Sequence, residues 1–340
     1  MNQSEVKIAG YTLPILMKHI IYGVAVGDAL GFPMQFKSRD YASRHPIVDM
    51  GKYRSGHEYH KYLPQIIGLW SDDTSLTLCL AESLASGYDL GDMAQKNYAW
   101  LSEGYRSALP YAFDIGRQCA IGIPQAKELA DKNAAELPNL IKQNIVNANG
   151  NGALMRILPL LIKTYGQDID TAYQYVKEVS ALTHPHIRSV FCCLYYLRFA
   201  ERILNKMDKH EAFEEIQKEM YDFSCRIPIT VKDAMELMRL IDYDIAAFDS
   251  NNVDNPSNYL HSSGYVVHSL EAALWCILNN ESFEETLLAA VKLGEDTDSI
   301  AAIAGGVAAL LYGFEEIPAN WIDLLQSKEE IEAVLALYQG

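Results

Sequence analysis

The chain has 340 residues, 49% of them hydrophobic and 21% charged, so it is long enough to bury a core and has the composition of a folded protein. Its 44 acidic and 28 basic residues give a formal net charge of −16. Nucleic-acid binding depends on clustered lysine and arginine, so DNA and RNA are not expected as partners. A single nucleotide ligand remains compatible with this charge, because metal ions can neutralise the carboxylates of a site locally.

The cysteines and the N-terminus indicate the cellular compartment in which the protein is expected. None of the six cysteines forms a C-x-x-C pair, and several lie in apolar runs, as Cys79 and Cys276 do, which is typical of free thiols in a reducing environment. Residues 1–8 are polar, and we expect no apolar span of about 18 residues after them. The sequence therefore predicts a cytoplasmic protein with no membrane partner, and a monomer is favoured.

Apolar residues recur at helical spacing along most of the chain. The first stripe covers residues 15–25 and runs into Gly27-Asp28-Ala29-Leu30-Gly31. Residues 36–67 are rich in Gly, Tyr, His and Pro, which predicts an irregular loop that caps a site. Further helices are predicted over residues 75–84, 171–182, 187–206, 209–223, 231–240, 266–279, 283–293 and 300–312.

Strand-like alternation is scarce, which favours an all-α fold. There is no periodic repeat and no low-complexity linker, so residues 1–340 are predicted to form a single compact multi-helix domain. Gly305 and Gly306 would weaken an exposed helix by about 1 kcal/mol each. We therefore expect them at a close contact between two helices in the centre of the fold, next to a central metal-containing cleft.

Two short acidic clusters are the strongest chemical signal. Ser71-Asp72-Asp73-Thr74 and Gly294-Glu295-Asp296-Thr297-Asp298-Ser299 each place two or more carboxylates and neighbouring hydroxyls where a helix is predicted to begin. Like charges this close repel unless a proton or cation lies among them. Neither cluster contains His or Cys, so the oxygen donors favour magnesium or manganese over zinc or copper. The alternative is that these residues only cap helices, and the repetition of the pattern weighs against it.

Seven segments follow one another along the chain: Gly27-Asp28-Ala29-Leu30-Gly31, Trp70-Ser71-Asp72-Asp73-Thr74, Phe113-Asp114-Ile115-Gly116, Gly150-Asn151-Gly152-Ala153-Leu154-Met155-Arg156, Thr183-His184, Ser263-Gly264-Tyr265-Val266-Val267 and Gly294-Glu295-Asp296-Thr297-Asp298. Together they resemble the ADP-ribosylglycohydrolase family, the relatives of dinitrogenase reductase-activating glycohydrolase. The resemblance covers residues 18 to 335. It implies an all-α, single-domain hydrolase with two Mg²⁺ ions, for which Mn²⁺ can substitute, acting on ADP-ribosylated proteins or small ADP-ribosyl substrates, with N-linked arginine expected.

The resemblance also implies residue roles. Cleavage of a glycosidic C–N bond passes through an oxocarbenium-like centre that fixed carboxylates stabilise, and paired cations can hold vicinal hydroxyls and polarise water. The implied metal ligands are Ser71, Asp72, Asp73, Asp296, Asp298 and Ser299. The implied catalytic residues are Asp114, Asp73 and Asp296. The implied substrate-binding residues are Gln35, Asn151, Gly152, Ala153, His184, Gly264 and Tyr265.

Several of these residues have plainer alternatives. Asp114 could be a turn or cap residue, and Tyr265 a core tyrosine with a satisfied hydroxyl. Asp28 either orients ligands from behind or caps the following loop. His184-Pro185-His186 invites a comparison with helical His-Asp phosphohydrolases, but no His-Asp pair follows at ligand spacing.

The turn at residues 149–152 is predicted to open an apolar helix near Ala153. The unpaired N–H groups of such a helix start suit a diphosphate. The alternative is that Asn-Gly marks only a turn.

Two departures from the family pattern bear on function. Ser71 and Ser299 replace the more usual Thr but keep the hydroxyl. Gln35 stands where many members have Glu, and Gln cannot accept or deliver a proton as a carboxylate does. Either Asp114 and the metals suffice for turnover, or the chain is a catalytically weak ADP-ribose-binding protein. A protein that keeps only the fold is disfavoured, since unpaired buried carboxylates would cost stability.

Overall fold

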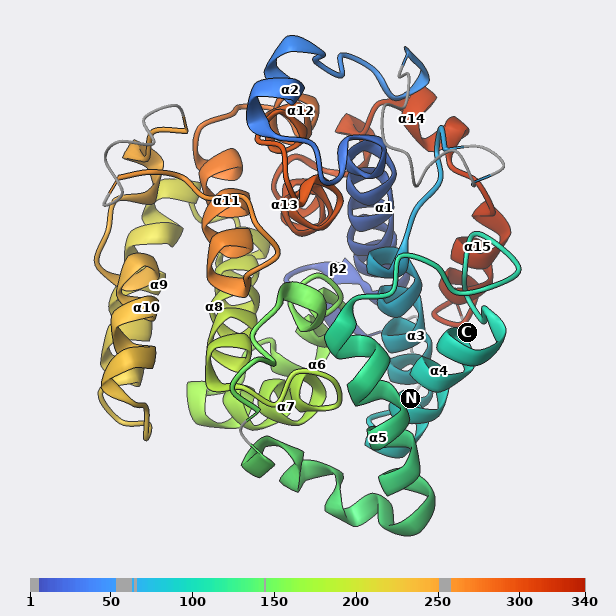
Figure 1. Ribbon diagram of the computed structural model, residues 1–340, viewed down its shortest axis with the longest axis vertical. Coiled ribbons are helices and arrows are strands. Elements are labelled where there is room, and N and C mark those ends of the chain that lie inside the picture. The colour runs from blue at the N-terminus through green and yellow to red at the C-terminus, as the bar shows by residue number, and fades with distance from the viewer. Residues whose placement is uncertain (1–5, 53–62, 64–65, 144, 251–257, 340) are drawn as a thin grey trace.

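The computed structural model describes residues 6–52, 63, 66–143, 145–250 and 258–339, and this part of the chain is mostly helical (Figure 1). Its one sheet is a two-stranded antiparallel hairpin of β1 (Lys7–Ile8) and β2 (Tyr11–Thr12). The prediction of a helical fold is confirmed. The α-helices are α1 (Leu13–Gly31), α2 (Arg39–Arg44), α3 (Asp72–Ser86), α4 (Leu90–Glu103), α5 (Arg117–Asn133), α6 (Leu161–Thr164), α7 (Ile169–Ala181), α8 (Ile187–Leu204), α9 (Lys209–Ser224), α10 (Val231–Ile241), α11 (Val266–Leu278), α12 (Phe283–Lys292), α13 (Thr297–Tyr312), α14 (Ala319–Leu324) and α15 (Lys328–Ala336). The 3₁₀ helices are η2 (Phe32–Met34), η3 (Met50–Lys52), η5 (Ala134–Gln143), η6 (Asn151–Ala153), η7 (Leu158–Leu160), η8 (Ile245–Ala247) and η9 (Phe314–Glu316).

The centre of the fold is the pair of helices α1 and α13, which lie side by side with α11 and α12 close by (Figure 1). Glycines let the two backbones touch. A Cβ atom on Gly23 would lie 2.4 Å from the carbonyl oxygen of Gly305, and one on Gly27 would lie 2.0 Å from that of Ala301. No side chain fits at such distances, so only glycine permits this crossing. The expectation that Gly305 marks a close helix contact is confirmed.

The same crossing brings both acidic clusters to one end of α1. A Cβ atom on Gly31 would lie 2.3 Å from the carbonyl oxygen of Thr297, whose hydroxyl donates to the carbonyl oxygen of Gly31 (2.8 Å). The start of α13 is therefore fixed against the end of α1. One turn earlier on α1, Asp28 accepts hydrogen bonds from the backbone N–H groups of Ser71 and Thr74 at the start of α3.

Helix α1 is more apolar than we expected. Together with η2 it forms a segment, Leu13–Met34, that is long and apolar enough to cross a membrane. Of the 18-residue stretch that meets this criterion, 89% is buried inside the protein. The prediction that no such span follows the N-terminus is wrong. A helix packed against α3, α12, α13 and α15 carries apolar residues around most of its circumference, as a membrane span does.

All the predicted helices except the one expected from Ala153 are present, and the two that carry the acidic clusters begin earlier than predicted. Asp72 and Asp73 lie in the first turn of α3, and Asp298 lies in the first turn of α13 after Asp296 at its N-cap position. Helices α2, α4, α5, α14 and α15 were missed. In α5 polar and charged residues are frequent and Pro124 lies inside the helix, which hides the apolar period.

One local prediction is wrong, and another falls partly outside the described residues. The apolar helix predicted from Ala153 is wrong: η6 is followed by turns, η7 and the short α6. Pro159 explains the interruption, because it has no N–H to donate and its ring clashes within a helix. The predicted loop over residues 36–67 contains α2 and η3, and its residues 53–62 and 64–65 lie outside the described residues.

Candidate active site

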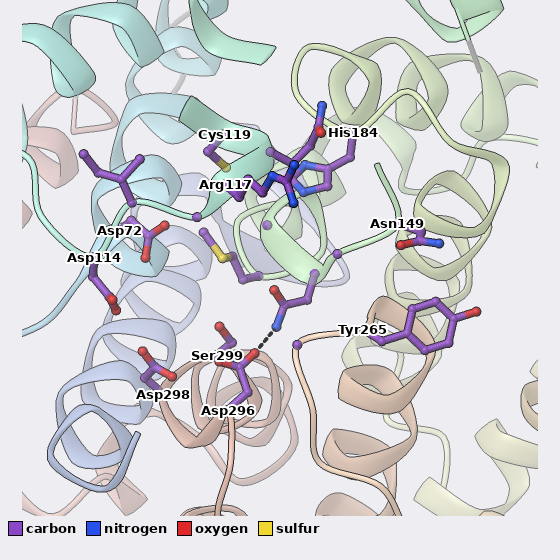
Figure 2. A pocket seen from close by; sticks show the side chains of 18 of the residues that line it. Asp72, Asp114, Arg117, Cys119, Asn149, His184, Tyr265, Asp296, Asp298 and Ser299 are labelled. Carbon is purple, nitrogen blue, oxygen red and sulfur yellow. Dashed lines mark hydrogen bonds between the residues drawn. The ribbon is translucent and has the colours of Figure 1, made fainter. Parts of the chain in front are cut away.

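A cavity of about 750 Å³ opens beside the starts of α3 and α13. In Figure 2 the acidic side chains gather at one side of it, whereas His184, Asn149 and Tyr265 lie at the other. Of the predicted site residues, Ser71, Asp73 and Ala153 do not line the cavity but lie buried behind it. The predicted residues that line it are Gln35, Asp72, Asp114, Asn151, Gly152, His184, Gly264, Tyr265, Asp296, Asp298 and Ser299.

The first acidic cluster is positioned by Asp28, which is fully buried in α1. Its carboxylate accepts from the N–H groups of Ser71 (2.9 and 3.0 Å) and Thr74 (3.0 Å) and from the Thr74 hydroxyl (2.6 Å). Asp28 thus caps α3 from a different helix, a role that neither of the two alternatives left open by the sequence had named. Ser71 Oγ in turn donates to Asp73 Oδ2 at 3.2 Å.

The second cluster is positioned by contacts with other loops. The Asp296 N–H donates to the carbonyl oxygen of Ser262 (3.0 Å), and Asn151 Nδ2 donates to Asp296 Oδ2 (2.5 Å; Figure 2). The Ser299 hydroxyl donates to Asp73 Oδ2 at 3.4 Å. This last contact joins the two clusters, so the prediction that they meet in one cleft is confirmed.

Burial raises the pKa of every carboxyl group in the clusters that faces the cavity or lies behind it. For Asp72, Asp73 and Asp298 the pKa lies well above the ordinary value, first because of burial and then because of neighbouring carboxylates. Burial also raises the pKa of Asp28 and of Asp296 to about 6. A cation among these groups would favour their ionised forms and relieve the repulsion.

Several oxygens of these carboxylates have no donor. Among the described residues, Asp73 Oδ1 and both Oδ atoms of Asp298 are buried without a hydrogen-bond partner. A buried acceptor left unpaired costs about 1–3 kcal/mol, and a hard cation would satisfy all three with the oxygen ligands it prefers. Within the same residues, no three His, Cys, Asp or Glu side chains are yet arranged so that they could hold a metal ion. The donor chemistry therefore fits magnesium, while the carboxylates would have to turn toward a common point.

Gln35 and Asp114 meet across the cavity wall. Gln35 Nε2 donates a hydrogen bond to Asp114 Oδ2 at 2.7 Å. An ionised carboxylate can only accept hydrogen bonds, so the Gln35 amide turns its NH₂ group rather than its oxygen toward Asp114. Asp114 adopts a left-handed backbone conformation with φ of 54°. Gln35 is itself held to the second cluster, because the Phe36 N–H donates to the carbonyl oxygen of Glu295 and the Glu295 N–H donates to that of Lys37, both at 2.6 Å.

Among the residues that the structure describes, the opposite side of the cavity carries no acidic cluster. The Asn151 N–H donates to the carbonyl oxygen of Gly264 (3.1 Å), so one donor of the predicted diphosphate turn is already engaged. His184 is buried next to this turn, with its Nδ1 2.8 Å from the Thr183 hydroxyl. Burial, and then the charge of Arg156, lower the His184 pKa to about 3. His184 is therefore neutral near pH 7.

Tyr265 lines the cavity, and its hydroxyl is engaged in hydrogen bonds. The hydroxyl accepts from Arg188 Nη1 (2.9 Å) and donates to Glu236 Oε2 (3.1 Å). Figure 2 shows this end of the side chain pointing away from the acidic clusters. The ring edge meets His268 at 4.9 Å between centroids.

Sequence reasoning missed the part of the wall that α5 supplies. Arg117, Gln118 and Cys119 line the cavity from the first turn of this helix, and Asn149 and Met155 line it from the turn region. The Cys119 thiol is buried, which raises its pKa to about 12 and keeps it protonated. The available signal was Gly116 directly after Ile115, a residue type accepted at the N-cap of a helix.

Comparisons with known proteins bear on this site. The family model described as ADP-ribosylglycohydrolase matches residues 17–340. The ADP-ribosylarginine hydrolase Tri1 of Pseudomonas putida (strain GB-1) is 28% identical over 324 residues, which cover 93% of this chain and 75% of that protein. The ADP-ribosyl-[dinitrogen reductase] glycohydrolase of Rhodospirillum rubrum is 25% identical over 324 residues, covering 93% of this chain and 94% of that protein.

A solved structure supports the same fold. It is described as an ADP-ribosylglycohydrolase-related protein complex and superposes with a TM-score of 0.64 at 23% identity, covering 96% of this chain and 97% of the other. At this identity the likeness shows the fold alone. The helical architecture is therefore shared over nearly the whole length of both chains.

Proposed function

Because the chain belongs to the ADP-ribosylglycohydrolase family, we propose that it is a magnesium-dependent hydrolase that removes ADP-ribose from modified arginine side chains. Relatives named for ADP-ribosylarginine and for ADP-ribosylated dinitrogen reductase support this substrate class. The observation that carries the proposal is the convergence of the two acidic clusters on one cavity, with buried carboxylate oxygens that have no donor among the described residues.

The cavity offers different chemistry to the two ends of ADP-ribose. Its volume of about 750 Å³ lies within the range of about 300–1,000 Å³ typical of small-molecule sites. The acidic side suits cations and the hydroxyls of the ribose that carries the linkage. The side with neutral His184, Gly152 and the ring of Tyr265 suits the rest of the nucleotide, because no carboxylate cluster there repels a diphosphate.

In the proposed reaction, water adds to the anomeric carbon and the C–N bond to arginine breaks. The bond electrons stay on the guanidine nitrogen, and the water loses a proton. Asp114 takes this proton on its carboxylate, whose Oδ2 accepts from Gln35 Nε2, and the freed guanidine nitrogen then takes up the proton as it leaves. Bound magnesium, held by oxygens of both clusters, would supply polarisation of the water and grip on the ribose hydroxyls. The residues that would hold the metal are Ser71, Asp72, Asp73, Asp296, Asp298 and Ser299.

The test uses peptides that carry ADP-ribose on arginine or on serine, with Mg²⁺ or with EDTA. We expect release from arginine only when Mg²⁺ is present. Asp114→Ala should lower kcat by about 10²–10⁴-fold, the usual contribution of a general acid or base. Release that is unaffected by EDTA, or that occurs only from serine, would refute the proposal.

A second function is favoured by Gln35. If the amide that contacts Asp114 has replaced a needed carboxylate, the protein is a catalytically weak ADP-ribose-binding protein. Wild type would then bind ADP-ribose but scarcely hydrolyse the arginine-linked peptide, and Gln35→Glu would raise kcat. We expect the opposite, namely that Gln35→Glu lowers the rate by placing a second negative charge against Asp114.

A further inference from the structure

Bulky apolar side chains stand exposed around the mouth of the cavity. Phe36 is 59% exposed, Ile115 38% and Ile121 43%, and all three line the cavity. We call these three residues the apolar rim. Val146, also exposed, lies between the lining residues Ile145 and Asn147. Scattered single apolar residues on a surface are ordinary, but a group of them around one opening marks an interaction site.

The backbone holds the apolar rim in place at a cost. Phe36 has a φ of 62°, and Asp114, which precedes Ile115, has a φ of 54°. Left-handed conformations of residues other than glycine cost about 1–3 kcal/mol and persist only where the surroundings fix them. Here the Phe36 N–H donates to the carbonyl oxygen of Glu295, and the Glu295 N–H donates to that of the next residue, Lys37, so both residues are fixed against Glu295. The Gln35 amide joins the two sides of the opening through Asp114.

We propose that the apolar rim docks the polypeptide that carries the modified arginine, with apolar residues next to that arginine packing against Phe36, Ile115 and Ile121. The inference rests on the proposed function and specifies a protein rather than a free ADP-ribosyl compound as the substrate. It also predicts a preference among acceptor sequences.

Charge and polarity favour this occupant. The guanidinium of an N-linked arginine remains positive, and the carboxylates of Asp72, Asp114 and Asp298 line the cavity beneath the rim. The diphosphate and the two riboses of ADP-ribose are polar and gain little from three bulky apolar side chains at the opening, and its one adenine ring could pack on only part of the apolar rim. A second copy of this chain would bring another formal charge of −16 against the first.

The test compares kcat/KM for three substrates: free ADP-ribosyl-arginine, a peptide with the modified arginine between leucine and valine, and the same peptide with serine and glycine in their place. We expect the leucine-valine peptide to be at least about tenfold better than the other two, which corresponds to burial of one apolar side chain. Equal values for the two peptides would overturn the proposal.

Variants locate the effect. The double variant Ile115→Ser/Ile121→Ser, and separately Phe36→Asn, should lower kcat/KM for the leucine-valine peptide to the value for the serine-glycine peptide. Asn suits position 36 because it tolerates the left-handed conformation. Val231→Ser and Met235→Ser, which alter exposed apolar residues on α10 outside the cavity lining, serve as matched controls and should change neither value.

The remaining outcomes separate this inference from the proposed function. If wild type hydrolyses none of the substrates, the proposed function fails, and peptide affinity measured by fluorescence anisotropy then decides the docking proposal by the same comparison of variants. A loss of rate on all three substrates alike would show that the apolar rim serves the cavity itself, and would overturn the proposal. So would rim variants that change only the oligomeric state in light scattering.

Discussion

The acidic side of the cavity and the side around His184 are equally buried, yet burial affects them differently. Asp298 is 1% exposed and His184 is 2% exposed. In both cases burial favours the neutral form, so the pKa of Asp298 rises and that of His184 falls to about 3. A neutral histidine beside the Thr183 hydroxyl is satisfied, whereas several carboxylates together leave oxygens without donors. Burial together with the density of like groups therefore creates the demand for a cation.

The largest expected effect comes from removing the carboxylates that lack donors. Asp73→Ala and Asp298→Ala should each abolish Mg²⁺ binding in calorimetric titration, because each removes a ligand at the junction of the two clusters. Asp298→Asn, which keeps the shape but not the charge, should weaken binding strongly. His184→Gln, on the other side of the cavity, should bind Mg²⁺ like wild type. Undiminished Mg²⁺ binding in both alanine variants would contradict the assignment of these two carboxylates as metal ligands.

The next effect concerns the residue that positions the first cluster. Asp28→Ala should lower the free energy of unfolding by about 2–3 kcal/mol, since it leaves the N–H groups of Ser71 and Thr74 buried without an acceptor. Asp168→Ala is the matched control, because Asp168 caps α7 on the surface with bonds to two N–H groups, which water can solvate once the side chain is removed. It should destabilise the protein clearly less than Asp28→Ala does. Urea unfolding measures both, and equal losses would mean that Asp28 acts as an ordinary cap.

On the side of the cavity around His184, substitutions at two glycines test whether the position of His184 matters for ADP-ribose binding. A Cβ atom at Gly152 would lie 2.8 Å from His184 Cε1, whereas at Gly150 the nearest atoms are 3.6 Å away. Gly152→Ala should therefore displace His184 and weaken ADP-ribose by about 1–2 kcal/mol, with Mg²⁺ affinity unchanged. Gly150→Ala should have little effect in the same titration. If the two variants bind ADP-ribose equally well, His184 does not help to shape the nucleotide side.

The smallest effect is a dependence of stability on pH. The His184 pKa is lowered from 6.5 to about 3 in the folded protein, so below pH 6.5 the unfolded chain binds a proton that the folded protein does not. Stability from this group is therefore lost as pH falls below 6.5, by about 1 kcal/mol at pH 5.5. The unfolding free energy of His184→Gln should fall less than that of wild type between pH 7.5 and 5.5. Identical pH profiles would show that His184 is not held neutral by burial.

Some predictions failed because a local signal was masked or because contacts between distant parts of the chain decided the outcome. The helix expected from Ala153 was read from an apolar run, but Pro159 divides that run into short turns. Helix α5 was missed because its many polar residues hide the helical spacing of its apolar residues. For the same reason Arg117, Gln118 and Cys119, which line the cavity, were not predicted as site residues. The role of Asp28 stayed open because its partners, Ser71 and Thr74, lie at the start of another helix.

Periodicity and side-chain chemistry are local properties, so the chain alone was enough to predict the helical class, the helices that carry the clusters, and the acidic and hydroxyl side chains of the site. How these parts meet could not be read in the same way. The glycine contacts of α1 with α13 bring the two clusters together, and the backbone hydrogen bonds of Glu295 with Phe36 and Lys37 hold the segment that places Gln35 against Asp114. Such contacts join residues far apart in the chain, and their distances depend on the packing of all the helices between them.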